Sequence, residues 1–206
     1  FRARAGGVIP RLRLARVLLD SWANGPGRRD VFWTAGCTIR CPGCVNPEFL
    51  PRDAGGVTPV DDLIRLLTVR VGRVEGITLS GGEPLEQPEG VGALVDGARA
   101  LGLTVVLLTG FTVEACLADP RRAALVAGCD LVVAGPFLRE RRVRGYPLLA
   151  SDNQELIFPT GRYGPLDLAG IPAAEILISP DEGIITGIDA GEAMRSLKAS
   201  LGRTRW

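Results

Sequence analysis

The sequence contains no histidine and no long apolar run, and both absences restrict what the chain can be. Histidine is the commonest metal ligand in proteins, so a metal centre in this chain must use other donors. A membrane-spanning helix needs about 20 consecutive apolar residues, and no run approaches that length. The chain begins at Phe1 without an initiating methionine or a signal-peptide pattern, which predicts a trimmed N-terminus and a cytoplasmic protein.

A strong charge of either sign is also missing. The chain has 24 basic and 23 acidic residues, for a formal net charge of +1. Nucleic-acid-binding proteins usually display a dense basic stripe, whereas the only charge run here is the short stretch 139–142, which we interpret as an exposed face. No lipidation or amphipathic membrane signal is present. We therefore predict neither a nucleic-acid nor a membrane partner.

The chain does contain three cysteines within eight residues: Cys37, Cys41 and Cys44. Three thiolates are one ligand short of closing a four-iron cluster or a tetrahedral zinc site. An incomplete set leaves one metal position open for a small molecule, as catalysis requires. Disulfides and structural zinc are the alternatives, although cysteines so close together leave little slack for pairing with one another. The spacing favours a cluster that holds a substrate or cofactor.

Other conspicuous residues are expected to be structural. Cys116 and Cys129 stand apart from the triplet and are predicted to pack as small buried hydrophobes. Trp22 and Trp33 flank the first predicted strand, where core or interface roles are commoner than catalytic ones. Arg28 and Arg29 follow a glycine-rich turn and could contact a cofactor carboxylate, but solvated arginines beside a turn are commoner, so we expect these two to be solvated.

Short β-branched or leucine-rich runs alternate with helix-like stretches after the cysteines, and this alternation predicts a parallel α/β sheet. Strands are predicted at residues 31–34, 76–80, 103–108, 130–134, 154–158 and 175–178. Helices are predicted at residues 58–70, with Thr58 as the cap, and at residues 91–101 and 190–201. The length of 206 residues fits one domain, and the stretch 159–172 is expected to be a connector or surface loop.

Unusual sequence follows several of these strands. In parallel α/β folds, functional groups gather at the carboxyl ends of the strands. The first predicted strand ends at the cysteines, the second at residues 80–84, the third at residues 109–110 and the fourth at residues 135–136. Glycines in such turns allow a ligand to approach the backbone closely, and Glu83 offers a carboxylate that could receive a cationic amine. An ordinary turn with a solvated glutamate is the alternative.

Cys37-x3-Cys41-x2-Cys44 followed by Gly81-Gly82-Glu83-Pro84 resembles the radical S-adenosylmethionine (SAM) enzymes. Within that superfamily, the chain is most similar to the activating enzymes of anaerobic ribonucleotide reductase. The motifs that carry this second resemblance are Asn24-Gly-Pro-Gly-Arg28, Cys41-Pro-Gly-Cys44-Val-Asn46, Thr109-Gly110-Phe111, Gly135-Pro-Phe137 and Ser151-Asp-Asn153-Gln154. Together they span roughly residues 21–158.

The resemblance implies a fold and a cofactor set. The fold is a partial (β/α)6 TIM-like barrel of parallel strands with the cluster loop after the first strand. Residues 21–160 would form the radical SAM core, preceded by an N-terminal extension, 1–20, and completed by a C-terminal extension, 161–206. The cofactors are a [4Fe-4S] cluster and SAM.

The same resemblance assigns residues to these cofactors. Three irons would be bound by Cys37, Cys41 and Cys44, and SAM would chelate the fourth. The residues expected to bind SAM are Ser80, Gly81, Gly82, Glu83, Thr109, Gly110 and Asn153. The segment 81–83 would position the methionine amino group, 109–110 would face the ribose, and Asn153 would form the pocket floor.

The resemblance also implies an activity, which is reductive cleavage of SAM to a 5′-deoxyadenosyl radical. That radical would install a glycyl radical on a partner enzyme, with a flavodoxin- or ferredoxin-type electron donor. The chain departs from the pattern at Val45, where many relatives carry an aromatic residue, and at residues 149–150, where they carry Arg-Gly. An enzyme that modifies a peptide or small metabolite remains an alternative, as does a non-enzymatic iron–sulfur or zinc module.

Overall fold

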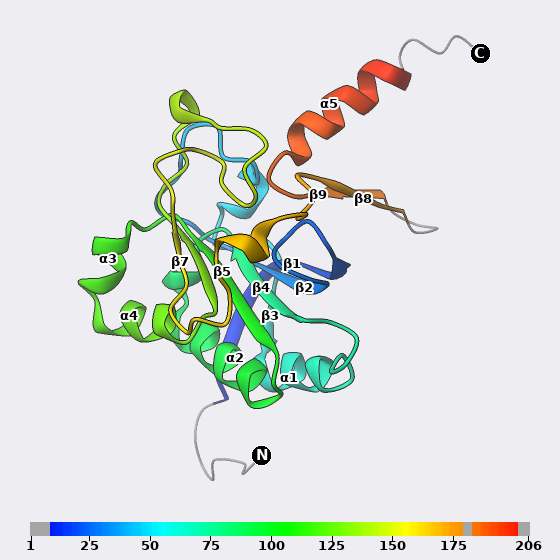
Figure 1. The fold of residues 1–206 in the computed structure, drawn as a ribbon. Coiled ribbons are helices and arrows are strands. Elements are labelled where there is room, and N and C mark those ends of the chain that lie inside the picture. The colour runs from blue at the N-terminus through cyan, green and yellow to red at the C-terminus, as the bar shows by residue number, and fades with distance from the viewer. Residues whose placement is uncertain (1–8, 179–182, 202–206) are drawn as a thin grey trace.

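The computed structural model describes residues 9–178 and 183–201. Within these residues, seven strands form one open sheet in the order β3-β1-β2-β4-β5-β6-β7, and two further strands form a separate hairpin (Figure 1). The sheet strands are β1 (Arg11–Ser21), β2 (Arg29–Thr34), β3 (Gly56–Pro59), β4 (Gly76–Gly81), β5 (Thr104–Thr109), β6 (Leu131–Ala134) and β7 (Glu155–Ile157). The hairpin strands are β8 (Glu175–Ile178) and β9 (Gly183–Thr186).

Helices connect the central strands. The α-helices are α1 (Val60–Thr68), α2 (Pro88–Ala100), α3 (Val113–Leu117), α4 (Pro120–Ala127) and α5 (Ala190–Leu201). Short 3-10 helices are η1 (Pro47–Phe49), η2 (Pro84–Glu86), η3 (Arg139–Arg141) and η4 (Pro165–Leu168). In Figure 1, α5 projects from the body of the molecule beside the β8–β9 hairpin. Among the described residues, no helix combines the length and apolar character that crossing a bilayer requires.

The predicted mixed α/β class with a largely parallel central sheet is confirmed, because β2, β4, β5 and β6 run parallel to one another. The predicted barrel of six parallel strands is not confirmed. The sheet is open, and β1, β3 and β7 pair antiparallel with their neighbours. A parallel neighbour needs a crossover that returns the chain to the other end of the sheet. The segment between β6 and β7 makes no such crossover, so β7 runs back antiparallel.

Two further expectations are corrected. The sixth predicted strand is β8, which pairs with β9 outside the main sheet. Helix α1 begins at Val60 after Pro59, without a side-chain cap, and the predicted cap Thr58 lies in β3. Strand β1 occupies residues that the sequence analysis assigned to an N-terminal extension, of which residues 1–8 lie outside the described part of the chain. The division into a core and extensions stays a prediction.

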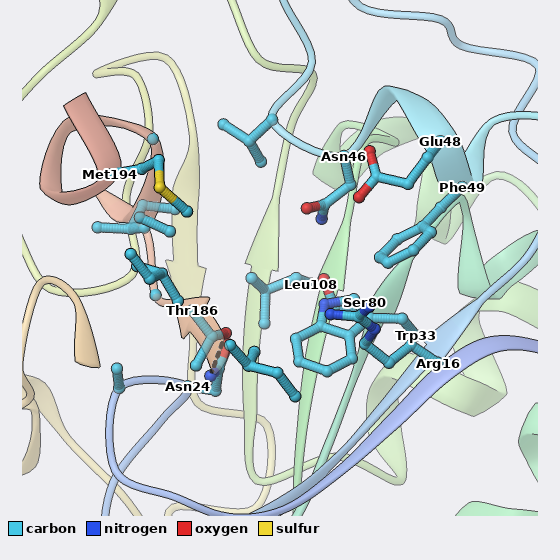
Figure 2. A pocket seen from close by; sticks show the side chains of 18 of the residues that line it. Arg16, Asn24, Trp33, Asn46, Glu48, Phe49, Ser80, Leu108, Thr186 and Met194 are labelled. Carbon is cyan, nitrogen blue, oxygen red and sulfur yellow. Dashed lines mark hydrogen bonds between the residues drawn. The ribbon is translucent and has the colours of Figure 1, made fainter. Parts of the chain in front are cut away.

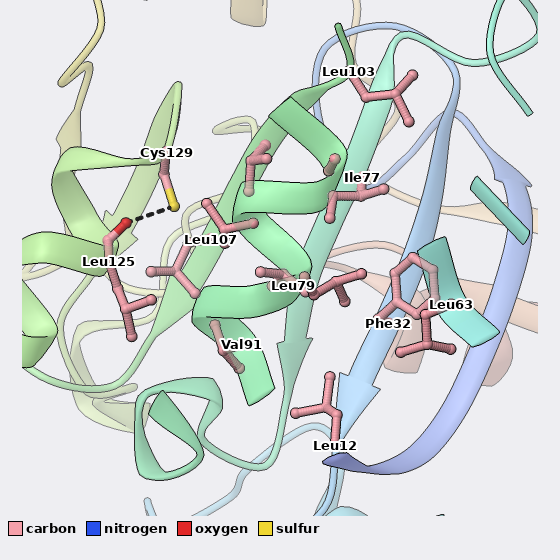
Figure 3. Close-up of a cluster of buried hydrophobic side chains, with 14 of the residues drawn as sticks. Leu12, Phe32, Leu63, Ile77, Leu79, Val91, Leu103, Leu107, Leu125 and Cys129 are labelled. Carbon is pink, nitrogen blue, oxygen red and sulfur yellow. Dashed lines mark hydrogen bonds between the residues drawn. The ribbon is translucent and has the colours of Figure 1, made fainter. Parts of the chain in front are cut away.

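The main core lies between the sheet and helices α1, α2 and α4 (Figure 3). Alternate strand residues such as Phe32, Leu79 and Leu107 face these helices and are fully buried. Cys116 and Cys129 are also fully buried in this core, as predicted. This layer holds the central strands in place, and their carboxyl ends are thereby fixed beside one another.

The opposite face of the sheet is covered by loops and the C-terminal hairpin. Trp33 packs there in a small cluster with Phe49, and the hairpin residue Ile184 lies against the same cluster. The predicted connector 159–172 contributes Tyr163 and Leu168 to a second cluster. Trp22 is instead 54% exposed.

Arg29 is fully buried, so the expectation of a solvated arginine is wrong. Its guanidinium donates hydrogen bonds to Thr78, Thr104 and Tyr163, and to backbone carbonyls of Pro26, Ile77 and Thr104. Burial lowers its pKa, whereas the nearby Tyr163 opposes that shift. Arg29 is the first residue of β2, and its partner Thr104 is the first residue of β5. Arg29 therefore lies at the amino end of the sheet, whereas the predicted site lies at the carboxyl ends of the strands.

Candidate functional site

The cysteine loop, defined as residues 36–50, leaves β2 and closes back on itself. The amide of Gly36 donates to the carbonyl of Phe49 at 2.9 Å, and that of Cys37 donates to the carbonyl of Leu50 at 3.1 Å. Within the loop, the amide of Cys44 donates to the carbonyl of Cys41 at 3.1 Å. The loop is therefore anchored at both ends, and its middle carries the cysteines.

Glu86, which the sequence analysis did not single out, braces this loop from the segment after β4. Its Oε1 accepts hydrogen bonds from the Thr38 amide at 2.8 Å and the Thr38 hydroxyl at 2.5 Å. Its Oε2 is buried and has no hydrogen-bond partner among the described residues. Thr38 follows Cys37 directly, so this brace positions the first cysteine. Nothing in the local sequence pattern distinguishes Glu86 from a solvated glutamate.

Gly81 and Gly82 lie directly beneath the start of the cysteine loop. The amide of Gly82 donates to the carbonyl of Thr34 at 2.7 Å. Gly81 has a φ of +115°, and a Cβ on Gly82 would come within 2.2 Å of the carbonyl oxygen of Gly36. Glycine is the residue that permits both this backbone conformation and this approach. The two glycines thus allow the turn after β4 to contact the loop.

Glu83 joins the ends of β4 and β5. Its side chain is only 1% exposed, and its carboxylate accepts hydrogen bonds from the amides of Leu85 and Gly110 and from the hydroxyl of Thr109, at 2.8–2.9 Å. Burial raises its pKa to about 7, although these three donors favour the charged form. The structure therefore brings three of the predicted SAM residues, Glu83, Thr109 and Gly110, into direct contact. A ligand amine at Glu83 would have to share the carboxylate with these donors.

Asn153 lies just before β7 and contacts the turn that follows β6. Its Nδ2 donates to the carbonyl of Pro136 at 2.8 Å, while its Oδ1 is buried without a partner among the described residues. Buried polar atoms nearly always have a partner, which can be a ligand or a water molecule. The neighbouring Gln154 donates to the carbonyl of Gly135 at 3.0 Å and so holds this turn in place. Asn153 therefore has one acceptor available for a bound molecule.

All five cysteines are free thiols, as the interpretation of the triplet requires. Cys37 is buried, whereas Cys41 and Cys44 are partly exposed. Burial raises the pKa of Cys37 and of Cys44. Both are therefore held as thiols in the metal-free protein, and metal binding must release protons.

The three thiols do not converge on one point. Among the described residues, no three Cys, Asp or Glu side chains are gathered closely enough to hold a single metal ion. A single zinc ion draws its thiolates to about 2.3 Å from one centre. Cysteines that bind three different irons of a cluster need not meet in this way. The donor set therefore fits a four-iron cluster better than a ready-made zinc site.

A pocket of about 260 Å³ opens beside the cysteine loop on the loop-covered face of the sheet (Figure 2). The sheet and the cysteine loop line it with Trp33, Val45, Asn46, Phe49, Ser80 and Leu108. Ser80 is therefore the predicted SAM residue that the structure places directly in the pocket wall. A concave site that combines apolar and polar side chains in this way can hold a small molecule.

A second part of the pocket wall comes from β9, α5 and the loop between them. These elements line it with Ile184, Ile185, Thr186, Ile188 and Met194. In Figure 2, Met194 on α5 lies across the pocket from Asn46, Glu48 and Phe49. No motif in the sequence of this segment indicates a site, so this wall becomes visible only in the folded chain.

Comparison with known proteins identifies the region around the cysteine loop. Residues 23–157 match the family described as "4Fe-4S single cluster domain". The match includes all three cysteines of the loop and ends before the β8–β9 hairpin.

Individual relatives agree with the family match. The chain is 32% identical over 143 residues to the anaerobic ribonucleoside-triphosphate reductase-activating protein of Escherichia coli (strain K12), covering 64% of this chain and 88% of that protein. It is 29% identical over 140 residues to the protein of the same name from Vibrio cholerae, with the same coverage of each chain. It is also 34% identical over 113 residues to the 7-carboxy-7-deazaguanine synthase of Hyperthermus butylicus, covering 52% of this chain and 46% of that enzyme.

Proposed function

Because the chain belongs to the 4Fe-4S single cluster domain family and to the anaerobic ribonucleoside-triphosphate reductase-activating proteins, we propose that it is a radical SAM activating enzyme. When bound, a [4Fe-4S] cluster and SAM supply a 5′-deoxyadenosyl radical through one-electron cleavage of SAM. We propose that this radical removes a hydrogen atom from a glycine α-carbon of a partner enzyme. An acidic redox protein of the flavodoxin or ferredoxin type would provide the electron in a reducing cytoplasm.

One observation carries the proposal: the turns after β2, β4 and β5 meet at one edge of the sheet. There the amide of Glu83 donates to the carbonyl of Gly36 at 2.8 Å, and the carboxylate of Glu83 binds the turn after β5. Carboxyl ends of parallel strands are where such folds bind ligands. Cofactors held by the cysteine loop and by these turns would therefore lie close together.

The protein residues have separate tasks in this proposal. Cys37, Cys41 and Cys44 would bind three irons and leave the fourth open for SAM. The turn 81–83 would orient the methionine group of SAM, and Asn153 would offer its unpaired Oδ1 to the nucleoside. The apolar side chains of the pocket beside Ser80, such as Trp33 and Leu108, would pack against a bound substrate.

A second candidate function is the modification of a small metabolite. The similarity to a 7-carboxy-7-deazaguanine synthase favours it, since that relative matches over about half of this chain. Gene context separates the two candidates. A neighbouring gene for a large reductase or lyase with a C-terminal glycyl-radical segment supports activation, whereas pathway genes support modification.

The central test is anaerobic reconstitution with iron and sulfide. We expect about four irons and four sulfides per chain, a paramagnetic signal of the reduced cluster that SAM perturbs, and formation of 5′-deoxyadenosine. Cys41→Ala should abolish 5′-deoxyadenosine formation while circular dichroism shows an intact fold. Cys129→Ala, at a buried core cysteine, is the matched control and should retain SAM cleavage. Zinc without sulfide, or continued SAM cleavage by Cys41→Ala, would contradict the proposal.

A further inference from the structure

The C-terminal segment, defined as β8, β9, α5 and the loop between β9 and α5, lies outside the family motifs but contributes to the pocket. The family match ends at residue 157, whereas the segment begins at Glu175. Nevertheless, the loop and helix after β9 place Ile188 and Met194 in the wall of the pocket. The pocket is thus shared between a cofactor-binding core and a segment outside the matched region.

Polar contacts fix this wall on one side to the loop between β1 and β2. The Glu175 carboxylate accepts hydrogen bonds from the amides of Trp22 and Ala23 and from the hydroxyl of Ser21. The Asn24 amide group donates to Thr186 Oγ1 at 3.0 Å, and Asn24 is nearly buried. The hairpin is therefore held in a defined position beside the pocket.

Ion pairs fix the other side of the wall to the segment after β6. Arg142 lies 2.7 Å from Asp189, and Arg144 lies 3.1 Å from Glu192 in the first turn of α5. The Arg142–Asp189 pair is largely shielded from solvent, with side-chain exposures of 26% and 16%. The C-terminal segment is thus attached on both sides of the pocket, to residues 21–24 on one side and to Arg142 and Arg144 on the other. These attachments hold its side chains in place relative to the core.

The wall that the C-terminal segment contributes to the pocket favours uncharged substrate groups. All five wall residues of the C-terminal segment named above are uncharged, and four of them are apolar. The charged residues on the opposite side, Arg16 and Glu48, have opposite signs. A charged side chain placed against apolar residues loses hydration without gaining a partner there. Neutral polar groups of Asn46 and Ser80 also line the pocket and suit the N–H and C=O groups of a peptide.

We infer that the C-terminal segment selects the substrate and admits an uncharged peptide segment whose reacting glycine is flanked by apolar side chains. This inference rests on the proposed function, because it concerns the substrate of the same radical chemistry. Met194 is the specificity-determining residue in this account, since it projects into the pocket from α5 (Figure 2). The family match ends before this wall, so substrate selection and SAM cleavage are measured as separate readouts.

The probe is a set of capped pentapeptides with a central glycine that carries two deuterium atoms on its α-carbon. Valine, aspartate or lysine flanks the glycine on both sides. Dithionite supplies the one electron that SAM cleavage consumes. In the coupled reaction, a C–D bond of the glycine breaks and a C–D bond to the 5′ carbon of the adenosyl group forms. The product is singly deuterated 5′-deoxyadenosine, and the unpaired electron remains on the glycine.

The decisive variants are Met194→Glu and its matched control Leu197→Glu. Both residues lie on α5 and are similarly exposed, at 36% and 37%, but of the two only Met194 is among the pocket-lining residues. We expect Met194→Glu to reduce deuterium transfer from the valine peptide about tenfold or more. Peptide-independent SAM cleavage by the same variant is measured as the reference, and deuterium transfer should fall several-fold more than this cleavage does. The lysine peptide should react better with Met194→Glu than with wild type.

A second readout does not need the cofactors. Calorimetric titration of the cofactor-free protein should show saturable binding of the valine peptide, weakened about tenfold or more by Met194→Glu and unchanged by Leu197→Glu. Equal losses in both variants, or none in either, would overturn the inference. A wild-type protein that cleaves SAM but takes no deuterium from the valine peptide would also overturn it and leave the cofactor chemistry standing. A wild-type protein that cleaves no SAM would instead refute the proposed function.

Discussion

At the scale of single residues, Glu83 shows how burial changes the meaning of a motif. Its sequence context suggested a carboxylate waiting for an amine, but its oxygens already accept hydrogen bonds from Leu85, Thr109 and Gly110. Removing such a buried acceptor leaves several donors unsatisfied, which is costly. Glu83 therefore stabilises the turns after β4 and β5 even without a ligand.

Glu83 should also give the cofactor-free protein a pH-dependent stability. Burial raises its pKa from 4.5 to about 7, so between these values the folded state keeps a proton that the unfolded state has released. The contribution of Glu83 to the free energy of unfolding should be largest below pH 4.5. It should fall by about 3 kcal/mol as the pH rises through 7. Urea denaturation at a series of pH values measures this fall.

Glu83→Gln should remove that slope, because glutamine does not titrate. Glu114→Gln, at an exposed position in α3, is the control and should keep the wild-type pH profile. Identical slopes in wild type and Glu83→Gln would mean that the carboxylate is ionised throughout, with its three donors outweighing the effect of burial.

At the scale of elements, the turn after β4 and the cysteine loop form one unit. The amide of Gly82 donates to the carbonyl of Thr34 just before the loop, and the amide of Glu83 donates to the carbonyl of Gly36 at its start. Glu86, in the following 3-10 helix η2, accepts a hydrogen bond from the amide of Thr38. The loop itself has little regular structure, so its shape depends on these contacts. A change in the turn should therefore be transmitted to the cysteines.

Gly82→Ala tests this coupling. Its Cβ would lie 2.2 Å from the backbone oxygen of Gly36, which cannot move without displacing the loop. We expect the free energy of unfolding to fall by about 2–4 kcal/mol and hydrogen exchange in the cysteine loop to accelerate. Gly56→Ala is the control, because its Cβ would have no neighbour within 4 Å. Equal stability of the two variants would show that the loop does not depend on this close approach.

At the scale of the whole molecule, an open sheet is completed by its C-terminal segment. The sheet ends at β3 and β7 and leaves one face for loops to cover, which a closed barrel would not require. The β8–β9 hairpin reaches that face, and its attachment depends on polar contacts such as those of Glu175 with the backbone of Trp22 and Ala23. The pocket wall should therefore detach without unfolding of the core.

Glu175→Gln weakens this attachment, because a neutral amide replaces the carboxylate that accepts from two backbone amides. Hydrogen exchange in β8 and β9 should speed up by about tenfold or more, while exchange in β4 and β5 stays unchanged. Glu155→Gln, at an exposed position in the edge strand β7, should leave both regions as in wild type. Faster exchange in β4 and β5 of Glu175→Gln would show that the segment and core unfold together.

The sequence by itself determined the chemical character of this protein. The spacing of Cys37, Cys41 and Cys44 predicted the iron ligands, and β-branched runs located the four parallel strands at the centre of the sheet. Both are local patterns, in which residue type and spacing along the chain carry the information.

Only the tertiary structure decided which distant groups meet. The burial of Arg29, the engagement of Glu83 and the brace at Glu86 depend on partners from other elements, which no local pattern records. The antiparallel edge strands and the pocket wall at Met194 likewise follow from how the chain returns across the sheet. Contacts between residues far apart in sequence exist only after the chain has packed, and in this protein such contacts build the pocket wall.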